Sequence, residues 1–284
     1  MKIAVVIPTL NEEQALPRTL ACVARLGFDE ILVVDGGSSD KTRDIAMSLG
    51  FEVRGSRFQE QHESLHPQTS PLTTSNVELR TAPVMLLTTE PGRAKQMNAG
   101  AAASRADVLL FLHADTHLPA EARHAIERAL DDPACVGGRF DVRFERDTGL
   151  AWLIARLISL RSRVSGIATG DQALFVRREV FERLDGFTDL PIMEDAEFTC
   201  RLKRAGRVAP LLAQVVTSYR RWERCGALQT IMLLWTLRLL YWLGVHPNRL
   251  KDLYASVRQE GRAHEPTAAH RRPTQKAGRL ARKT

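Results

Sequence analysis

The sequence predicts an α/β fold in which helices cover both faces of a mostly parallel central sheet. Three strand-length segments, residues 3–7, 30–34 and 108–112, are almost wholly apolar. Such runs are typical of parallel strands buried on both faces, whereas strands with one wet face alternate apolar and polar residues. Each run is followed by a polar turn and a segment of helical spacing, which is the order of βαβ units.

The other elements continue this alternation. We expect strands at 51–54, 84–87, 173–176 and 211–217, and a strand with one polar face at 136–144. Helices are expected at about 16–24, in a second segment that ends at about residue 49, and at 92–104, 119–130, 149–164 and 196–205. Residues 57–82 are rich in Gln, His, Ser, Thr and Pro, and this composition predicts a mobile surface insertion without a core of its own.

The net charge of +7 is concentrated at one end of the chain. Residues 262–284 carry +6 and predict a disordered basic tail, while the rest of the chain carries +1. This distribution does not predict specific nucleic-acid binding, which needs a basic patch on the folded part. The four cysteines form no CxxC pair, and the N-terminus lacks an apolar stretch long enough for a signal peptide. We therefore expect a cytoplasmic protein.

Polar side chains follow each of the three predicted buried strands. They are Pro8, Thr9 and Glu12 after the first, Asp35 after the second, and His113 and Asp115 after the third. Open parallel sheets bind ligands beyond the carboxyl ends of their strands. In extended geometry His113 and Asp115 project from the same side and can share one divalent ion. Alternatively, Asp35 is a turn residue, Asp115 caps the next turn and His113 is a half-buried histidine.

Further candidate residues lie in the second half of the pattern. Arg93 opens the helix at 92–104, where a positive charge opposes the helix dipole unless an anion binds there. Asp171 and Gln172 precede the strand at 173–176, and Glu194 and Asp195 precede the helix at 196–205. Helix capping stays open as the alternative for Glu194.

Arg221 and Trp222 suit a phosphate or a sugar face, with a solvated surface as the alternative. Residues 227–243 predict an apolar helix with Arg238 at its middle. Placing that charge at a bilayer centre costs about 2.5 to 3.5 kcal/mol, so a membrane-spanning helix is not expected. A place inside the fold, in a dimer or against a membrane surface stays open.

Five of these segments together resemble the family 2 glycosyltransferases of the GT-A fold, over residues 1 to about 223. In family order they are IPTLNE at 7–12, VVDGGSSD at 33–40, FLHADT at 111–116, GDQALFV at 170–176 and MEDAEF at 193–198. GRAKQMNAGA, PIMEDAEF and RRWERCG are similar to the subgroup named for radical-SAM proteins and arsenosugar biosynthesis. The resemblance implies a GT-A-like, Rossmann-like three-layer domain at 1–223 and a C-terminal apolar helical segment at 224–261.

The resemblance also implies a role for each candidate residue. The nucleoside side of the donor site is formed by Pro8, Thr9, Glu12 and Asp35, and the diphosphate is contacted by Arg93. Asp115 with His113 binds Mn or Mg, and Asp195, with Glu194 beside it, provides the catalytic base. The acceptor or phosphate side holds Asp171, Gln172, Arg221 and Trp222. His113 stands in place of the first aspartate of the family's DxD motif, so the choice of metal stays open. Ser218 stands where processive members carry Gln, so transfer of a single sugar is expected.

The expected reaction is inverting transfer from a UDP- or GDP-sugar to the hydroxyl of a small-molecule or lipid acceptor. One alternative is a transferase that acts on a polyprenyl phosphate or other lipid, with peripheral contact at the inner face of the cell membrane. Another is a non-catalytic nucleotide-sugar-binding protein, in view of His113. A sugar-phosphate nucleotidyltransferase is disfavoured because the Gly-rich, arginine-ending loop expected after the first strand is absent. The oligomeric state is not predicted.

Overall fold

The structure is a computed structural model, which describes residues 1–48, 50–52 and 84–254. The predicted insertion at 57–82 and the predicted basic tail at 262–284 lie outside the described residues, as does the end of the 224–261 segment.

Within the described residues, nine strands form one sheet in the order β3-β4-β2-β1-β5-β8-β7-β9-β6. They are β1 Ile3–Thr9, β2 Glu30–Asp35, β3 Gly50–Glu52, β4 Val84–Thr88, β5 Val108–Phe111, β6 Thr116–His117, β7 Cys135–Phe144, β8 Leu174–Arg177 and β9 Arg207–Thr217. In this sheet order the first five strands, β3, β4, β2, β1 and β5, are parallel to one another, and β9 is parallel to β7. β8 and β6 are antiparallel to their neighbours. The prediction of a mostly parallel sheet is confirmed.

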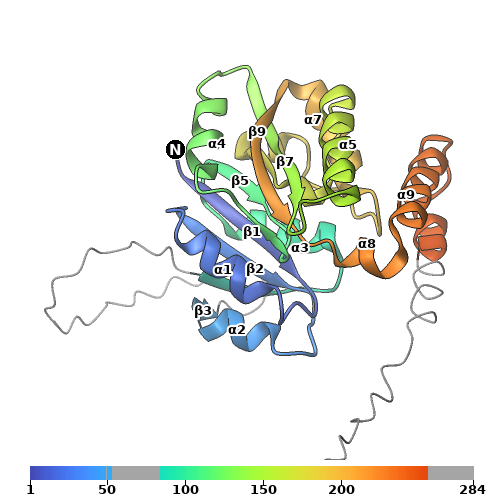
Figure 1. Cartoon of the computed structure of the whole chain (residues 1–284). Helices are drawn as coiled ribbons and strands as arrows, with labels where there is room; N and C mark the ends of the chain where they lie inside the picture. The colour runs from blue at the N-terminus through green and yellow to red at the C-terminus, as the bar shows by residue number, and fades with distance from the viewer. Residues whose placement is uncertain (49, 53–83, 255–284) are drawn as a thin grey trace, which may run out of the picture.

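Helices cover both faces of the sheet (Figure 1). They are α1 Leu16–Ala24, α2 Thr42–Ser48, α3 Arg93–Ala103, α4 Ala122–Leu130, α5 Leu150–Ser165, α6 Arg178–Arg183, α7 Glu194–Ala205, α8 Arg220–Cys225 and α9 Ala227–Trp242. Successive residues of a strand point to opposite faces. Accordingly, Val5 joins a core with α1 and α4, while Val6 joins a second core with α3 and α7. The predicted three-layer α/β fold is confirmed.

A glycine allows α3 to approach the sheet closely. A Cβ atom on Gly100 would lie 2.4 Å from Cγ1 of Val6 and 3.0 Å from Cγ2 of Val34. Any side chain at Gly100 would therefore push α3, and with it Arg93 at the start of that helix, away from the strands.

Two elements differ from the prediction. The polar face expected for β7 is present only near its end, where Asp141 is half-buried and Arg143 is exposed, whereas helices pack on the earlier part of the strand and Arg139 is only 2% exposed. The Nε–H of Arg139 donates a hydrogen bond to the hydroxyl of Ser162 on α5. The helix expected from residue 119 begins at Ala122, because residues 119–121 form a turn in which the Ala122 N–H donates to the Pro119 carbonyl at 3.0 Å.

The C-terminal part of the described chain is helical, as expected. Ile231 and Leu234 of α9 pack against the cluster that Trp222 of α8 forms with residues of α5 and with Phe144 of β7. A further helix over residues 247–254 follows α9, and Leu237 and Leu250 are each only 1% exposed. Among the described residues, every helix is too short or too polar to cross a bilayer.

Candidate functional site

The carboxyl ends of the central strands meet at one edge of the sheet. β1, β2 and β5 are parallel and end there at Thr9, Asp35 and Phe111. β8 is antiparallel to β5 and places Leu174 opposite Phe111, so residues 169–172 arrive at the same edge. This topology brings candidate residues from four distant segments of the chain into one region.

The two loops that follow β1 and β2 bind each other. The N–H of Asn11 donates to Oγ of Ser38 at 2.8 Å, and its Oδ1 accepts from the N–H of Ser39 at 2.8 Å. The N–H of Glu12 donates to Oγ1 of Thr42, also at 2.8 Å. Asn11 has a φ of 56°, a left-handed conformation that asparagine tolerates better than most residues. This clamp was not predicted, because it joins residues that lie 27 and 28 positions apart along the chain.

Asp35 forms the turn that begins its own loop. Its Oδ2 accepts the N–H groups of Gly37 at 3.0 Å and Ser38 at 2.9 Å, and its side chain is fully buried. Thr9 is also buried and donates its hydroxyl to the Val34 carbonyl at 3.4 Å. The contacts of Asp35 match the alternative interpretation of this residue as a turn residue. A nucleoside contact by Thr9 or Asp35 stays a prediction. Pro8, beside Thr9 in β1, is half-buried.

Arg93 and Glu194 form an ion pair across the site. Nη1 of Arg93 lies 3.4 Å from Oε1 of Glu194, with the arginine side chain 46% exposed and the glutamate side chain 5% exposed. Burial and then the neighbouring Asp195 carboxylate raise the pKa of Glu194, and the charge of Arg93 opposes this rise. A half-exposed arginine side chain with one buried partner can still contact a diphosphate.

The carboxylates of Glu12 and Asp115 lie within electrostatic reach of each other. Burial raises the pKa of Glu12, the charge of Asp115 raises it further, and Arg220 opposes the rise. A cation between two carboxylates relieves their repulsion, and Mg²⁺ is commonly held by one or two carboxylates together with substrate phosphates. In the described part of the chain, no three His, Cys, Asp or Glu side chains form a metal site by themselves. The residues therefore fit a metal ion that takes its remaining ligands from a nucleotide diphosphate and water.

The backbone from His113 to Thr116 is a turn. The N–H of Thr116 donates to the His113 carbonyl at 3.1 Å. The expected extended geometry across His113 and Asp115 is therefore wrong, because β5 ends at Phe111 and β6 begins only at Thr116. His113 packs against Gly170, where a Cβ atom would lie only 2.2 Å from Nε2 of the imidazole.

The carboxylate of Asp195 is held by two backbone N–H groups. Oδ2 accepts from Gly170 and Oδ1 from Ala196, each at 2.6 Å. Asp171, in the short helical turn Gly170–Gln172, accepts the Thr169 hydroxyl at 2.5 Å. These bonds fix Asp195 and the 169–172 segment relative to each other.

The side chain of Gln172 joins the 169–172 segment to β7. Its side chain is fully buried, its Nε2 donates to the Phe140 carbonyl at 3.2 Å, and its Oε1 accepts the N–H of Thr169 at 3.2 Å. Both ends of the amide are used within the protein, so this geometry does not support the predicted contact with acceptor or phosphate. The capping box with Thr169 explains why the sequence needs a glutamine here.

Trp222 also has a packing role. It is 8% exposed, its ring stacks on Tyr219 with a centroid distance of 6.4 Å, and it meets Phe144 edge-on at 5.9 Å. This position joins α8 to β7 and does not support the predicted contact with a sugar or phosphate. Arg221 lies in α8, but its side chain is outside the described part of the structure.

Arg161 of α5 is a site residue that the sequence analysis missed. Burial and, after it, the charge of Arg238 on α9 lower its pKa to about 10, although Asp171 and Asp195 oppose the decrease. The guanidinium stays charged at neutral pH and lies within electrostatic reach of both aspartates. The run LRSRVS offered a signal, because arginines recur in an otherwise apolar helix.

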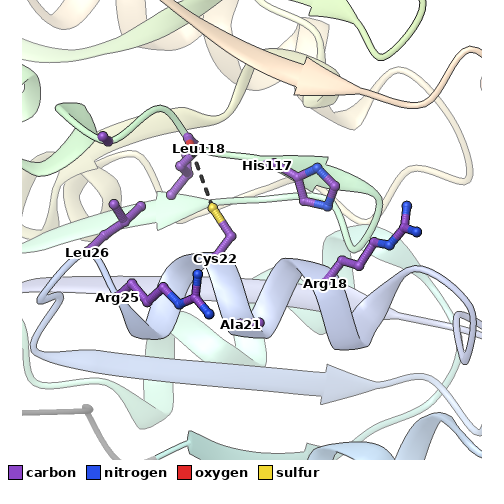
Figure 2. Close-up of a pocket in the computed structure, with 8 residues that line it drawn as sticks. Arg18, Ala21, Cys22, Arg25, Leu26, His117 and Leu118 are labelled. Atoms are coloured by element: carbon purple, nitrogen blue, oxygen red, sulfur yellow. Dashed lines mark hydrogen bonds between the residues drawn. The ribbon is translucent and has the colours of Figure 1, made fainter. Parts of the chain in front are cut away.

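Two cavities differ in volume and in chemistry. A cavity of about 620 Å³ lies between α1 and the segment around β6 (Figure 2). Arg18, Cys22, Arg25 and His117 line it, but it contains none of the predicted site residues. A second cavity of about 10 Å³, the size of one water molecule, is lined by Arg93, His113, Gly170 and Asp195 among others. Convergence of charged side chains, and not volume, identifies the second as the candidate site.

Comparison with solved structures defines the class of fold. TarS of S. aureus has a TM-score of 0.54 at 17% identity, with 77% of this chain and 37% of TarS covered. Glucosyl-3-phosphoglycerate synthase from Mycobacterium tuberculosis has a TM-score of 0.51 at 17% identity, with 86% of this chain and 80% of that chain covered. The chain therefore has the fold of the GT-A glycosyltransferases.

Comparison of sequences points to one family. Residues 4–62 match Glycosyl transferase family 2. The probable glycosyltransferase YdaM of Bacillus subtilis (strain 168) is 28% identical over 229 residues, which are 72% of this chain and 47% of YdaM. The undecaprenyl-phosphate 4-deoxy-4-formamido-L-arabinose transferase of Pseudomonas aeruginosa is 28% identical over 221 residues, 72% of this chain and 57% of that protein.

The chain thus spans about half the length of the curated relatives it matches. These matches support a glycosyltransferase of family 2. They give no support to the narrower resemblance to the radical-SAM and arsenosugar subgroup.

Proposed function

We propose that the protein is an inverting glycosyltransferase that moves a single sugar from a nucleotide-diphospho-sugar to an acceptor hydroxyl. The observation that carries this proposal is the convergence of Arg93, Glu12, Asp115 and Asp195 at the carboxyl edge of the sheet. Transfer from a charged donor requires a positive charge near the diphosphate, a carboxylate that binds a metal ion and a carboxylate that accepts the hydroxyl proton. The family match over residues 4–62, which include the clamped loops, supports the same activity.

On the donor side, Arg93 contacts the diphosphate and the clamped loops after β1 and β2 form the nucleoside site. The Arg93 side chain is 46% exposed, which supports contact with phosphate oxygens while Glu194 binds its Nη1. The M. tuberculosis neighbour was solved in complex with Mg²⁺ and UDP, and TarS 1-349 in complex with UDP-GlcNAc. These ligands favour a UDP-sugar over a GDP-sugar as the donor to test first.

Asp115, with Glu12 near it and His113 on the same turn, would hold a Mn or Mg ion. When bound, the ion neutralises charge that develops on the departing nucleoside diphosphate. Arg93 contributes to the same stabilisation from the protein itself. A nitrogen ligand from His113 favours Mn²⁺ over Mg²⁺.

Asp195 is the proposed general base. The acceptor hydroxyl oxygen forms a bond to the anomeric carbon as the bond from that carbon to the diphosphate oxygen breaks, and the hydroxyl proton passes to the Asp195 carboxylate. One displacement of this kind inverts the anomeric configuration. The two N–H groups that bind the Asp195 carboxylate hold it in place.

The acceptor is a small molecule or a lipid. A lipid is favoured by the exposed apolar side chains of α5 and α9, and the relative from Pseudomonas aeruginosa is named for an undecaprenyl phosphate. A non-catalytic nucleotide-sugar-binding protein is the remaining alternative, and catalysis that is lost in Asp195→Asn would exclude it.

The donor site is tested by titrating UDP and GDP into the protein with and without Mn²⁺ and following the heat of binding. We expect one nucleotide to bind, more tightly with Mn²⁺, and Arg93→Gln to weaken binding by roughly tenfold or more because a charge-assisted hydrogen bond is lost. Lys95→Gln, two residues further along α3 and 41% exposed, is the matched control. Absence of binding by either nucleotide would end the proposal.

A further inference from the structure

Two helices beside the candidate site expose long rows of apolar side chains. The α5 row is Leu150, Leu153, Leu157, Leu160 and Val164, which are 45% to 81% exposed. The α9 row is Met232, Trp235, Leu239 and Trp242, which are 61% to 73% exposed. Both rows have alternating spacings of three and four residues, so each forms one continuous stripe along its helix, about 21 Å long on α5 and about 15 Å on α9.

These stripes are additional to the faces that α5 and α9 bury. Ile154 and Ala155 of α5 pack with Phe144 and Trp222, and Ile231 and Leu234 of α9 pack against the same cluster. Both helices are therefore apolar on two sides, whereas a helix on a protein surface normally has one polar face. Apolar surface of this extent marks a contact with another protein or with a membrane.

The charge of the two helices distinguishes between these partners. Neither α5 nor α9 contains an Asp or Glu, while α5 carries three arginines and α9 carries Arg238. Arg156 lies over the ring of Trp152 at 5.1 Å, on the exposed side of α5. Pairing with a second copy would bring like charges together without the acidic partners that stabilise paired helices. An anionic lipid surface supplies the missing opposite charge.

The kinds of apolar residue favour the same partner. Trp235 and Trp242 lie in the α9 row, and tryptophan is enriched at the level of lipid headgroups because its ring is apolar and its N–H is polar. Residues 262–284 add a net charge of +6 close in sequence to α9. Basic residues near a membrane surface each contribute to attraction by anionic lipids.

We propose that the α5 row and the α9 row bind the surface of an anionic membrane, with both helices lying in the plane of the headgroups. Helices of this kind insert one apolar face and do not cross the bilayer. Arg161, a half-buried residue of α5, is within electrostatic reach of Asp171 and Asp195. Docking through the α5 row therefore brings the candidate site close to the lipid surface, where a lipid acceptor would be found. Only this last step rests on the proposed function.

Flotation of the purified full-length chain with lipid vesicles tests the docking without any nucleotide sugar. We expect binding to vesicles of phosphatidylcholine with phosphatidylglycerol, and weaker binding to phosphatidylcholine alone. The double variant Leu157→Glu, Leu160→Glu should bind at least about tenfold less, since the burial of one leucine is worth about that factor. Met47→Glu is the matched control, because Met47 is an exposed apolar residue on α2.

Tryptophan fluorescence gives a second readout that does not depend on recovering all variants in a stable form. Emission should shift to the blue on addition of anionic vesicles, and the shift should decrease in Trp235→Phe, Trp242→Phe. The proposal is overturned if the wild type does not bind, or if the leucine double variant binds as well as the wild type, which would assign binding to the basic tail. It is also overturned if light scattering shows a dimer that the leucine substitutions dissociate while vesicles are not bound.

Discussion

Replacement of Gly170 by alanine tests the closest contact in the candidate site. A Cβ atom at this position would lie 2.2 Å from Nε2 and 2.7 Å from Cε1 of His113, whereas ordinary contacts begin at 3.4 Å. The imidazole would have to retreat by about 1 Å, and the adjoining cavity of about 10 Å³ leaves little room for that movement. Overpacking of this kind costs about 1 to 3 kcal/mol.

Chemical and thermal unfolding measure this effect. Each kcal/mol corresponds to a decrease in Tm of roughly 2 to 4 °C for a domain of this size. His113→Ala removes the ring, so the double variant Gly170→Ala, His113→Ala should be no less stable than His113→Ala alone. This non-additivity is the specific signature of two residues in contact.

Turnover provides an independent measure of the same contact. The N–H of Gly170 binds Asp195, so a shift of this segment should lower kcat more than it changes the KM for the donor. If Gly170→Ala is as stable as the wild type, or if its effect is the same with and without His113, the packing described for this site is wrong.

Three further predictions follow from the charges and hydrogen bonds around the site. Burial raises the pKa of Glu194 above its ordinary value of 4.5. The stability that Glu194 contributes is therefore fully present below pH 4.5 and is lost as the pH rises through the higher pKa of the folded state. The free energy of unfolding of the wild type should fall relative to that of Glu194→Gln as the pH increases from 4.5. A pH-independent difference in urea unfolding would contradict this. Thr42→Val leaves the N–H of Glu12 without its acceptor and should cost about 1 to 3 kcal/mol in the same assay, whereas Thr89→Val removes only an exposed hydrogen bond to the adjacent Glu90 carbonyl and should cost little. Asp115→Asn should abolish the increase in nucleotide affinity produced by Mn²⁺ in calorimetry, while affinity without metal is retained; an unchanged metal effect would remove Asp115 from the metal site.

The sequence predicts the sheet well because its strands are unusually regular. Unbroken apolar runs such as 108–112 are possible only where both faces are covered, and β5 is buried throughout. The short elements α6, α8 and β6 were not predicted, because segments of two to six residues contain too few positions to establish a period.

The motifs point to Arg93, Asp115 and Asp195, and the sheet topology brings these residues to one edge. Their roles at that edge stay predictions, and their geometry was predicted less well. The sequence could not show that Gln172 and Trp222 are buried, since burial depends on Phe140 and Phe144 of β7, about 30 and 80 residues away along the chain. Nor could it show that Arg161 lies within electrostatic reach of Asp195, because that proximity depends on how α5 packs.

The extended backbone expected at His113 illustrates the same limit. A local pattern of His, Ala, Asp is compatible with a strand or a turn, and the hydrogen bond from Thr116 decides between them.

The most direct test of the account is release of nucleoside diphosphate from a panel of UDP- and GDP-sugars, with and without Mn²⁺, by the wild type and Asp195→Asn. Loss of a general base should decrease the rate by roughly 10² to 10⁴ while the nucleotide still binds. Turnover of one donor by the wild type and a fall of that size in the variant is the predicted result. Equal rates in both proteins would contradict the role of Asp195, and binding of a nucleotide without any turnover, in the presence of lipid and small-molecule acceptors, would contradict catalysis itself.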